Sequence, residues 1–544
     1  MHKTTARAAF ALSVAALLVL SGCSAPSSDD GADSDIDTLR VAMAEVTSNL
    51  DPATYNVPAN NVLMAGAVGY LVSYAFGDFP DDAVYDGAVP VVETDNYVPE
   101  LAESWEFADD NLSLTMKLRE GVLSPYGNEL TAEDVKWTAE RNVALTTVGN
   151  FGMTVGKIDK ENPVTVIDDY TVQWNLTETS PLLVKIMTWS WFAPIDSVEA
   201  QKNVTADDPW ATEWLSGNTA FFGPYHVTEF DPGQSVTLEV NENYWDAAPE
   251  IERIVMQTVP DAGSRQQLVQ RGEVDFVADV PRQQLVALQG ESDVQVILSP
   301  SLRFSYLQYN VNVEPLGDKL VRQAISYAIP YDTILEDAYQ GTSLPAETVG
   351  MWLPNASDAT SPYEFDLDKA RELLTEAGYP DGFAVNLTYS MANPGPENEQ
   401  AAVLIANSLA EIGIDVTLVK PSSEADFGAS YSSGEFQMAI AGLSPGAPDL
   451  GYALFVMAHS GGFQNFGKFA GPAEFDELLI DGISNPDEQE RQQSMAQALE
   501  MYHEYVPATP IADPLVGIVA SPRVQGVQIG VWAHPYWKYV TLSE

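Results

Sequence analysis

The segment Gly442-Leu443-Ser444-Pro445-Gly446 follows the G-x-S-x-G pattern that presents the nucleophilic serine of many hydrolases. In those enzymes the backbone N–H of the residue after the serine helps to form the oxyanion hole. That residue is Pro445 here, and proline has no backbone N–H. Losing one such donor slows a serine protease by roughly 10²–10³-fold. The pattern also needs a helix directly after the serine, which Pro445 and Gly446 disfavour. We therefore predict that the chain is not an enzyme.

Other residues that could carry chemistry are scattered along the chain. His459, His503 and His534 are candidate bases for a serine hydrolase. No two histidines have the H-x₃-H spacing of a zinc site, and no G-x-x-x-x-G-K-[ST] nucleotide loop is present. We therefore predict no metal and no cofactor. The densest aromatic cluster, Trp-Ser-Trp-Phe at 189–192, is interpreted as packing.

The charge of the chain excludes one class of partner. The sequence of 544 residues has 78 acidic and 25 basic residues, which gives a formal net charge of −53. A field of that sign repels nucleic acid and anionic lipid, so we predict no nucleic-acid partner. With 45% hydrophobic and 19% charged residues, the composition is that of an ordinary globular protein. Most of the acidic charge is interpreted as a solvated surface.

The N-terminus has the pattern of an export signal. Two basic residues precede an apolar run at 8–20, which is about 13 residues long and too short to span a bilayer. The run ends in Leu-Ser-Gly-Cys, which resembles the bacterial lipobox, and Cys23 is the only cysteine. We predict a signal peptide at 1–22, lipidation of Cys23, and a disordered acidic tether at 23–35. No later segment is apolar for 18 residues.

The body alternates between strand and helix patterns. Residues 112–120 and 171–178 alternate apolar and polar positions, as half-buried strands do. Thr131 is a predicted helix N-cap, with two acids in the following turn. The apolar run at 62–76 is predicted to be helical, and Gly378 is expected to end another helix. The alternation along most of the chain predicts an α/β fold.

Four stretches together carry a family resemblance. They are LAESWEFADDNLSLTMKLREGV followed by LTAEDVKWTAER, then GPYHVTEFDPGQSVTLEVNENYW, SRQQLVQRGEVDF and DKLVRQAISYAIPYDTI. Their order and spacing resemble the family 5 solute-binding proteins of bacterial ABC importers, of the oligopeptide- and dipeptide-binding type. The resemblance implies a two-lobed periplasmic-binding-protein type II fold, with an extra subdomain on the first lobe and a two-strand hinge. It also implies that the ligand is enclosed between the lobes.

The resemblance divides the chain into segments. Lobe I takes 36–85, 220–303 and 514–544, the extra subdomain takes 86–219, and lobe II takes 304–513. The implied partners are permease subunits with a separate ATPase, and a monomer is expected. The lipid anchor would hold the protein on the extracytoplasmic side of the cell membrane, in the periplasmic space or on the outer face.

The resemblance also gives the 442–446 segment a role in binding. In peptide-binding relatives this segment has the form A-G-W-x-A-D-Y-x-D, and its first Asp pairs with the ligand's α-ammonium. Here Leu443 takes the Trp place, Gly446 takes the place of that Asp, and Asp449 matches the second acid. A one-residue alignment slip is the alternative. The predicted ligand-binding residues are Tyr55, Asn56, Val57, Phe151, Tyr431, Leu443, Ser444 and Gly446.

The resemblance implies a receptor that captures short peptides and delivers them to a membrane permease. The alternative within the same class is a receptor for an oligosaccharide or another non-peptide solute. The missing acid at Gly446 favours a sugar, whereas the acidity of the chain and the usual ligands of the family favour peptides. A secreted esterase that uses Ser444 is the disfavoured alternative of another class.

Overall fold

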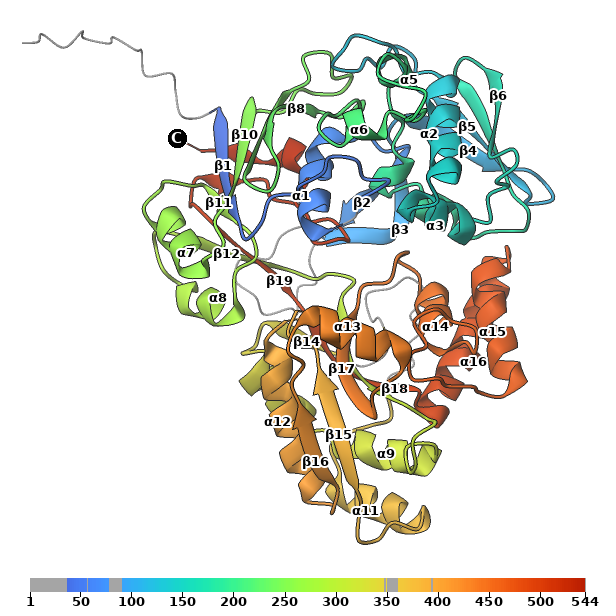
Figure 1. Cartoon of the computed structure of the whole chain (residues 1–544), viewed down its shortest axis with the longest axis vertical. Coiled ribbons are helices and arrows are strands. Elements are labelled where there is room, and N and C mark those ends of the chain that lie inside the picture. Colours follow the sequence, from blue (N-terminus) through green and yellow to red (C-terminus); the bar gives the residue numbers. More distant parts are fainter. Residues whose placement is uncertain are drawn as a thin grey trace, which may run out of the picture. The chain divides into compact units, whose positions relative to one another are not determined.

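The computed structural model describes residues 37–55, 57–77, 91–346, 349, 361–392 and 395–543 (Figure 1). The predicted signal peptide, Cys23, the predicted tether and Asn56 lie outside these residues. The described chain contains two large mixed sheets, a four-stranded antiparallel sheet and two antiparallel two-stranded sheets. Helices lie between most of the strands, so the α/β prediction is confirmed.

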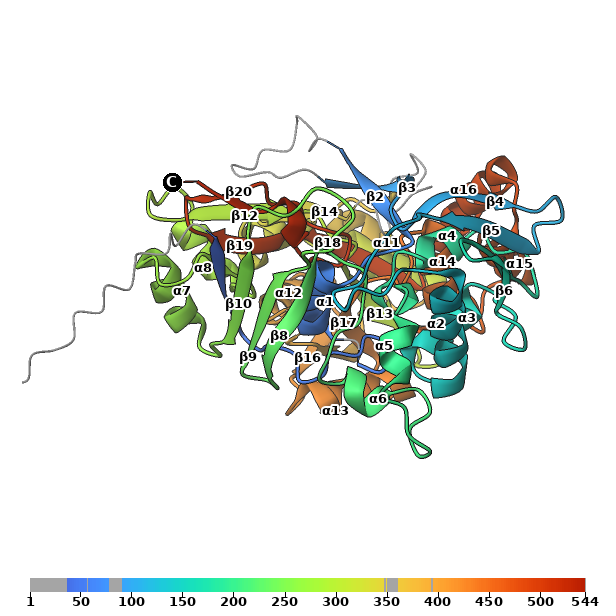
Figure 2. The ribbon, with the colours of Figure 1, turned by 90° about the horizontal axis from the view of Figure 1, so that it is seen from above.

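The first lobe is built on a seven-stranded sheet in the order β12-β19-β11-β1-β10-β9-β8, and Figure 2 shows several of these strands side by side. The central strand β1 is parallel to both neighbours, β10 and β11. Parallel neighbours need a long crossover connection, and helices supply much of it here. The strands are β1 Thr38–Met43, β8 Tyr225–Asp231, β9 Ser235–Val240, β10 Arg253–Thr258, β11 Phe276–Val277, β12 Gln295–Ser299 and β19 Val516–Ala520, and the helices are α1 Pro58–Ala67, α7 Ala262–Gln270 and α8 Arg282–Leu288.

A four-stranded antiparallel sheet, β4-β5-β7-β6, forms a separate subdomain. In β5 the buried positions alternate with exposed or half-buried ones, as its sequence pattern predicts. The predicted N-cap is confirmed: the Thr131 N–H donates to Asp134 Oδ2 at 2.7 Å, where the helix α2 begins. The strands are β4 Ala102–Phe107, β5 Ser113–Leu118, β6 Val164–Asp168 and β7 Thr171–Asn175, and the helical segments are α2 Ala132–Leu145, α3 Val148–Val155, α4 Leu183–Ile186, η1 Ser190–Phe192, α5 Ser197–Gln201 and α6 Thr212–Leu215.

The second lobe is built on a six-stranded sheet in the order β14-β18-β13-β17-β15-β16. Its strands are β13 Phe304–Tyr309, β14 Ser343–Pro345, β15 Ala384–Tyr389, β16 Asp415–Val419, β17 Met438–Leu443 and β18 Ala508–Pro514. Its helical segments are α9 Lys319–Tyr327, α10 Tyr331–Thr333, η2 Ile334–Ala338, α11 Leu367–Glu376, α12 Glu397–Ala410, α13 Glu424–Ser433, α14 Leu450–Ala458, α15 Ala473–Ser484 and α16 Glu488–Tyr505.

The chain passes between the two large sheets at two places. Residues 300–303 connect β12 to β13, and residue 515 connects β18 to β19. The strands that enter and leave these connections are hydrogen-bonded partners on both sides, β12 with β19 in one sheet and β13 with β18 in the other. These paired crossings form the two-strand connection that the resemblance implies.

The predicted helix over 62–76 is wrong in its second half. Helix α1 ends at Ala67, and the strand β2 Val72–Gly77 follows and pairs with β3 Val91–Pro99. The run is apolar throughout, so hydropathy alone does not separate a helix from a buried strand. At Gly69 the backbone passes so close to the neighbouring chain that an added Cβ would lie 2.9 Å from the Phe222 carbonyl oxygen.

The C-terminal segment returns to the first lobe. The short strands β20 Val524–Gln525 and β21 Thr541–Leu542 pair with each other, and the 3-10 helix η3 Trp537–Tyr539 lies between them. The Trp537 indole N–H donates to the Val62 carbonyl oxygen in α1 at 2.7 Å. This bond and the burial of Trp537 fix the C-terminal loop against α1.

Candidate ligand-binding site

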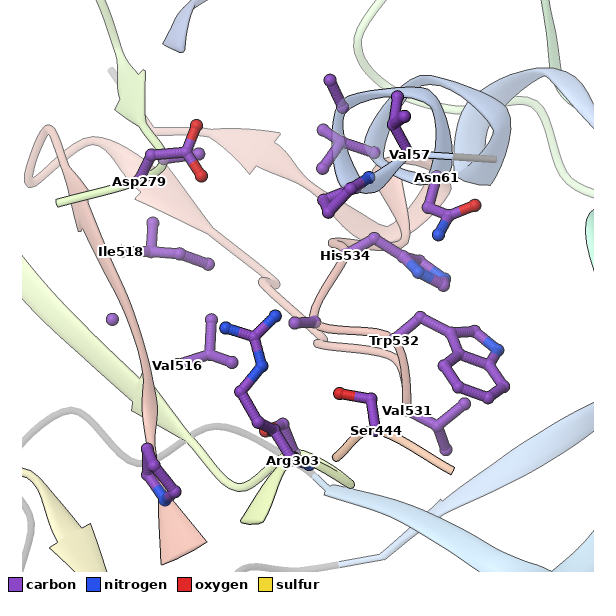
Figure 3. Close-up of a pocket in the computed structure, with 18 of the residues that line it drawn as sticks. Val57, Asn61, Asp279, Arg303, Ser444, Val516, Ile518, Val531, Trp532 and His534 are labelled. Carbon is purple, nitrogen blue, oxygen red and sulfur yellow. Dashed lines mark hydrogen bonds between the residues drawn. The ribbon is translucent and has the colours of Figure 1, made fainter. Parts of the chain in front are cut away.

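A cavity of about 850 Å³ is lined by residues of both lobes (Figure 3). The first turn of α1 and the end of β11 contribute from the first lobe, and Ser444 and Gly446 contribute from the second. Residues of both crossings line it as well. Small-molecule sites in proteins have volumes of roughly 300–1,000 Å³, and they occur preferentially between domains.

The structure brings four of the predicted binding residues to this cavity: Val57, Phe151, Ser444 and Gly446. They come from three separate parts of the sequence, and Figure 3 labels Val57 and Ser444 on its wall. Asn56 lies outside the described residues. The ligand contacts of these side chains stay a prediction.

The other three predicted residues lie elsewhere among the described residues. Tyr431 is buried in the second lobe, where its hydroxyl hydrogen-bonds Gln308 Oε1 at 2.6 Å. Leu443 is the last residue of β17 and packs in the core, opposite Phe304. Tyr55 is half-buried, and its carbonyl oxygen accepts a hydrogen bond from the side chain of Asn60 at 2.7 Å. None of the three is among the residues that line the cavity.

Asp449, the second acid of the compared pattern, is an interior ion-pair partner. Its carboxylate lies 2.7 Å from Lys185 Nζ and 2.8 Å from Arg491 Nη1, and its side chain is fully buried. Burial alone would raise the pKa of Asp449, but the attraction of both cations outweighs burial and holds the pKa below its usual value. It also caps α14 by accepting from the Tyr452 N–H at 3.0 Å. Asp449 therefore does not replace the carboxylate that Gly446 lacks.

The surroundings of Gly446 are close-packed. A Cβ added there would lie 3.0 Å from the Tyr452 hydroxyl and 3.6 Å from Cζ2 of Trp189. The segment also lacks the geometry of a hydrolase elbow, because β17 ends at Leu443 and the next helix begins only at Leu450. Ser444 is exposed in the loop between them.

The charged residues that line the cavity include Asp279 from the first lobe and Arg303 from the crossing after β12 (Figure 3). Asp279 is exposed, and its φ of +56° is a left-handed conformation that a non-glycine residue adopts at some cost. Strained backbone of this kind is concentrated at functional sites. Burial and then the nearby Arg282 lower the pKa of Arg303, whereas Glu397 and Asp279 oppose that shift.

A largely buried ion pair on the cavity wall joins the lobes. Arg282 Nε of α8 lies 2.9 Å from Glu397 Oε1 of α12, with side-chain exposures of 15% and 5%. The same guanidinium donates to the Thr342 carbonyl oxygen at 2.8 Å and to the Leu515 carbonyl oxygen at 3.3 Å. These bonds fix the wall near Arg303 and occupy the Arg282 guanidinium.

Aromatic side chains cover much of the remaining wall. Trp189 and Trp191 line the cavity, although the sequence favoured packing for this cluster. Phe151 stacks on Trp189, with ring centroids 6.5 Å apart and planes at 6°. Trp532 and His534 come from the C-terminal loop, and neither is predicted from the sequence to contact a ligand. No local motif marks these positions, because only the tertiary fold brings them to the cavity.

No helix in the described part of the chain has the length and hydropathy needed to cross a membrane. Across 37–543, omitting the gaps given above, no group of three or more His, Cys, Asp or Glu side chains is placed to hold a metal ion.

Comparison with known proteins gives consistent relationships. Residues 96–465 match the family of bacterial extracellular solute-binding proteins, family 5 middle region. Heme-binding protein A of Haemophilus influenzae is 29% identical over 453 residues, which cover 79% of this chain and 81% of the relative. The dipeptide-binding protein of Escherichia coli is 27% identical over 478 residues, which cover 83% of this chain and 87% of the relative.

A solved structure extends the comparison to the fold. The periplasmic binding protein DppA of Helicobacter pylori, an ABC-transporter-associated protein in complex with the peptide STSA, superposes with a TM-score of 0.73 and 26% identity. The superposition covers 93% of this chain and 98% of DppA. With the two lobes, the paired crossings and the cavity between them, these matches show that the chain belongs to family 5 of the bacterial extracellular solute-binding proteins, the non-enzymatic receptors of ABC importers.

Proposed function

We propose that the chain captures short peptides in the cavity between its lobes and delivers them to an ABC permease served by a separate ATPase. The observation that carries this proposal is the pair of opposite charges on the cavity wall, Asp279 and Arg303. A free peptide has an α-ammonium and an α-carboxylate, which match an exposed aspartate and a half-buried arginine. Asp279 would then supply the acid that is missing at Gly446, from the other lobe.

The relatives support a peptide ligand without excluding other solutes. One is named a dipeptide-binding protein, and the DppA structure contains a peptide. Another is named a heme-binding protein, and the aromatic wall with Trp189 and Trp532 would suit a planar ligand or a sugar. A receptor for an oligosaccharide or another non-peptide solute is therefore the second candidate.

We also propose the placement of the protein in the cell and the bounds of its parts. A lipid on Cys23 and the tether at 23–35 would hold the folded body, as a monomer, on the extracytoplasmic side of the membrane. The proposed division assigns 86–219 to the extra subdomain and 304–513 to lobe II, with the rest of the folded body in lobe I. The strands of the four-stranded and six-stranded sheets support it, because they fall within those two segments apart from the final residue of β18.

The experiment is a thermal-shift screen followed by calorimetry. The panel contains di- to pentapeptides, oligosaccharides, glutathione and haemin. A ligand at 100 times its Kd stabilises the native state by about 2.7 kcal/mol. We expect a peptide to give the largest shift. A shift with a non-peptide solute and none with any peptide would reject the peptide assignment.

The Asp279 contact is tested with the best peptide and its N-acetylated form. A charge-assisted hydrogen bond contributes roughly 1.5–3 kcal/mol, which is about 10- to 150-fold in affinity. We expect acetylation to weaken binding by that factor in the wild type and to have little effect in Asp279→Asn. Asp293→Asn is the matched control, because Asp293 is exposed in the same lobe and does not line the cavity. An equal acetylation penalty in Asp279→Asn and in the wild type would place the ammonium elsewhere.

A further inference from the structure

His534 is the most unusual polar side chain in the cavity wall. It is only 3% exposed, and neither Nδ1 nor Nε2 has a hydrogen-bond partner among the described residues. Buried polar side chains are nearly always hydrogen-bonded, and an unpaired one costs roughly 1–3 kcal/mol. Because the imidazole lines the ligand cavity, a bound ligand is the direct explanation for its missing partners.

The loop that carries His534 is closed by its own backbone contacts. The Gly530 N–H donates to the His534 carbonyl oxygen at 2.8 Å, and Ile529 and Pro535 form an isolated bridge that closes the turn. Ala533 has a left-handed φ of +63°, a cost that the closed loop imposes. A Cβ on Gly530 would lie 2.8 Å from Nε2, so the glycine leaves room for the ring. The backbone that carries the imidazole is thus held by contacts within the loop itself.

The neighbours of His534 define the chemistry of this part of the cavity. Asn61, in the first turn of α1, also lines the cavity, and its amide extends toward the imidazole in Figure 3. The indole N–H of Trp189, another lining residue that is 2% exposed, has no partner among the described residues either. Burial lowers the pKa of His534 to about 4, so the ring is neutral at pH 7, with one donor and one acceptor nitrogen.

We propose that His534 and Asn61 form a specificity subsite that hydrogen-bonds an uncharged polar side chain of the bound peptide. The inference rests on the proposed function and deepens it. The charged pair Asp279 and Arg303 would take the peptide termini, while this subsite reads one side chain. An amide or hydroxyl group satisfies a neutral imidazole and an amide, which each donate and accept. An apolar side chain of the same shape would leave both unpaired.

The expected selectivity follows from that unpaired state. Sites built to hydrogen-bond a ligand group reject isosteres that lack it, because the buried polar groups of the site stay unsatisfied. We expect peptides with Gln, Thr or Tyr at the subsite to bind roughly 10- to 100-fold more tightly than the matching peptides with Met, Val or Phe.

The test measures this ratio in variants by calorimetry. The probes are three series of alanine tripeptides, with one position at a time carrying the Gln/Met, Thr/Val or Tyr/Phe pair. His534→Leu should abolish or reverse the preference at one position, whereas His534→Gln should preserve it, because an amide also donates and accepts. His503→Leu is the matched control: His503 is also buried with an unpartnered Nε2, and it lies outside the cavity lining.

The outcomes separate this inference from the proposed function. Preferences that are unchanged in His534→Leu, or lost equally in His503→Leu, would overturn the role of His534. If no peptide of the di- to pentapeptide panel binds the wild type, the peptide assignment fails. The His534 variants are then compared with whichever of maltotriose, glutathione or haemin binds. A loss in His534→Leu that His534→Gln restores would keep the subsite, and equal affinities would remove it.

Discussion

The ion-pair cluster around Asp449 allows a sharp test of how the second lobe is held to the four-stranded subdomain. Asp449 caps α14, Lys185 lies in α4 of the subdomain, and Arg491 lies in α16. The perturbation is Asp449→Asn, which removes the charge but keeps an oxygen that can cap the helix. Thr179 also reaches the second lobe, with its hydroxyl 2.6 Å from the Ser484 carbonyl oxygen.

The size of the expected destabilisation follows from the burial of the three charged side chains. The side chains of Asp449, Lys185 and Arg491 are 0%, 7% and 4% exposed. The substitution removes the carboxylate that pairs with Lys185 and leaves Arg491 with only the more exposed Glu488 as an ion-pair partner. Removing one partner of a buried ion pair destabilises proteins by roughly 3–5 kcal/mol. Because the Asn retains the cap, nearly all of the loss is electrostatic. We expect Asp449→Asn to lower the free energy of unfolding by about 3–5 kcal/mol.

The assay is urea denaturation monitored by circular dichroism, with a double-mutant cycle. Asp449→Asn combined with Lys185→Met should cost less than the sum of the single changes, with a coupling of roughly 1–3 kcal/mol. Glu372→Gln is the control, because Glu372 forms an ion pair with Lys369 at 3.1 Å in which both side chains are exposed. Such pairs contribute roughly 0–1 kcal/mol. If Asp449→Asn costs no more than this control, the buried cluster does not hold the lobes together.

The remaining predictions concern the anchor and one buried acid. Cys23→Ala should release the protein from membranes or leave its signal uncleaved, and membrane fractionation that finds it bound and processed would contradict the lipid anchor. Asp513 is buried in β18, its carboxyl oxygens have no hydrogen-bond partner among the described residues, and burial raises the pKa of the carboxyl far above the usual value. A raised pKa stabilises the fold only while the carboxyl is protonated, so this contribution fades as pH rises above about 4. Asp513→Asn should therefore be more stable than the wild type at pH 8, by a margin that shrinks toward pH 4, and a margin independent of pH would refute the argument.

Local patterns in the sequence predicted the regular elements where burial is one-sided. Strands β5 and β7 alternate in burial along half-exposed sheets, and Thr131 starts α2 as its side-chain chemistry predicts. The secondary structure of the run at 62–76 was harder to predict, because a segment that is buried on all sides shows no periodic alternation of apolar and polar residues. The two-lobed arrangement came from the family resemblance, and local pattern alone does not predict it.

The cavity was less predictable, because its wall is assembled from residues far apart in the sequence. Asp279, Trp189 and His534 are separated by at least 90 positions along the chain, and each sits in an ordinary local context. Tyr431 illustrates the opposite error: it is an aromatic residue that was expected to contact the ligand, but it packs in the core and does not line the cavity. A single sequence shows which residues have side chains suited to binding or catalysis. Which of them line one cavity depends on how the two lobes are joined.

The paired crossings between the lobes also constrain how the cavity opens. Ser299 pairs with Val516 on one side, and Ser305 pairs with Ala512 on the other, so the two crossing strands are bonded to each other at both ends. A relative rotation that keeps these ladders intact must bend both strands together about one axis. Torsion of one lobe against the other would strain the single-residue connection at Leu515 before the four-residue connection at 300–303. The expected motion is a flexion with one degree of freedom, which admits the ligand along the edge of the cavity opposite the crossings.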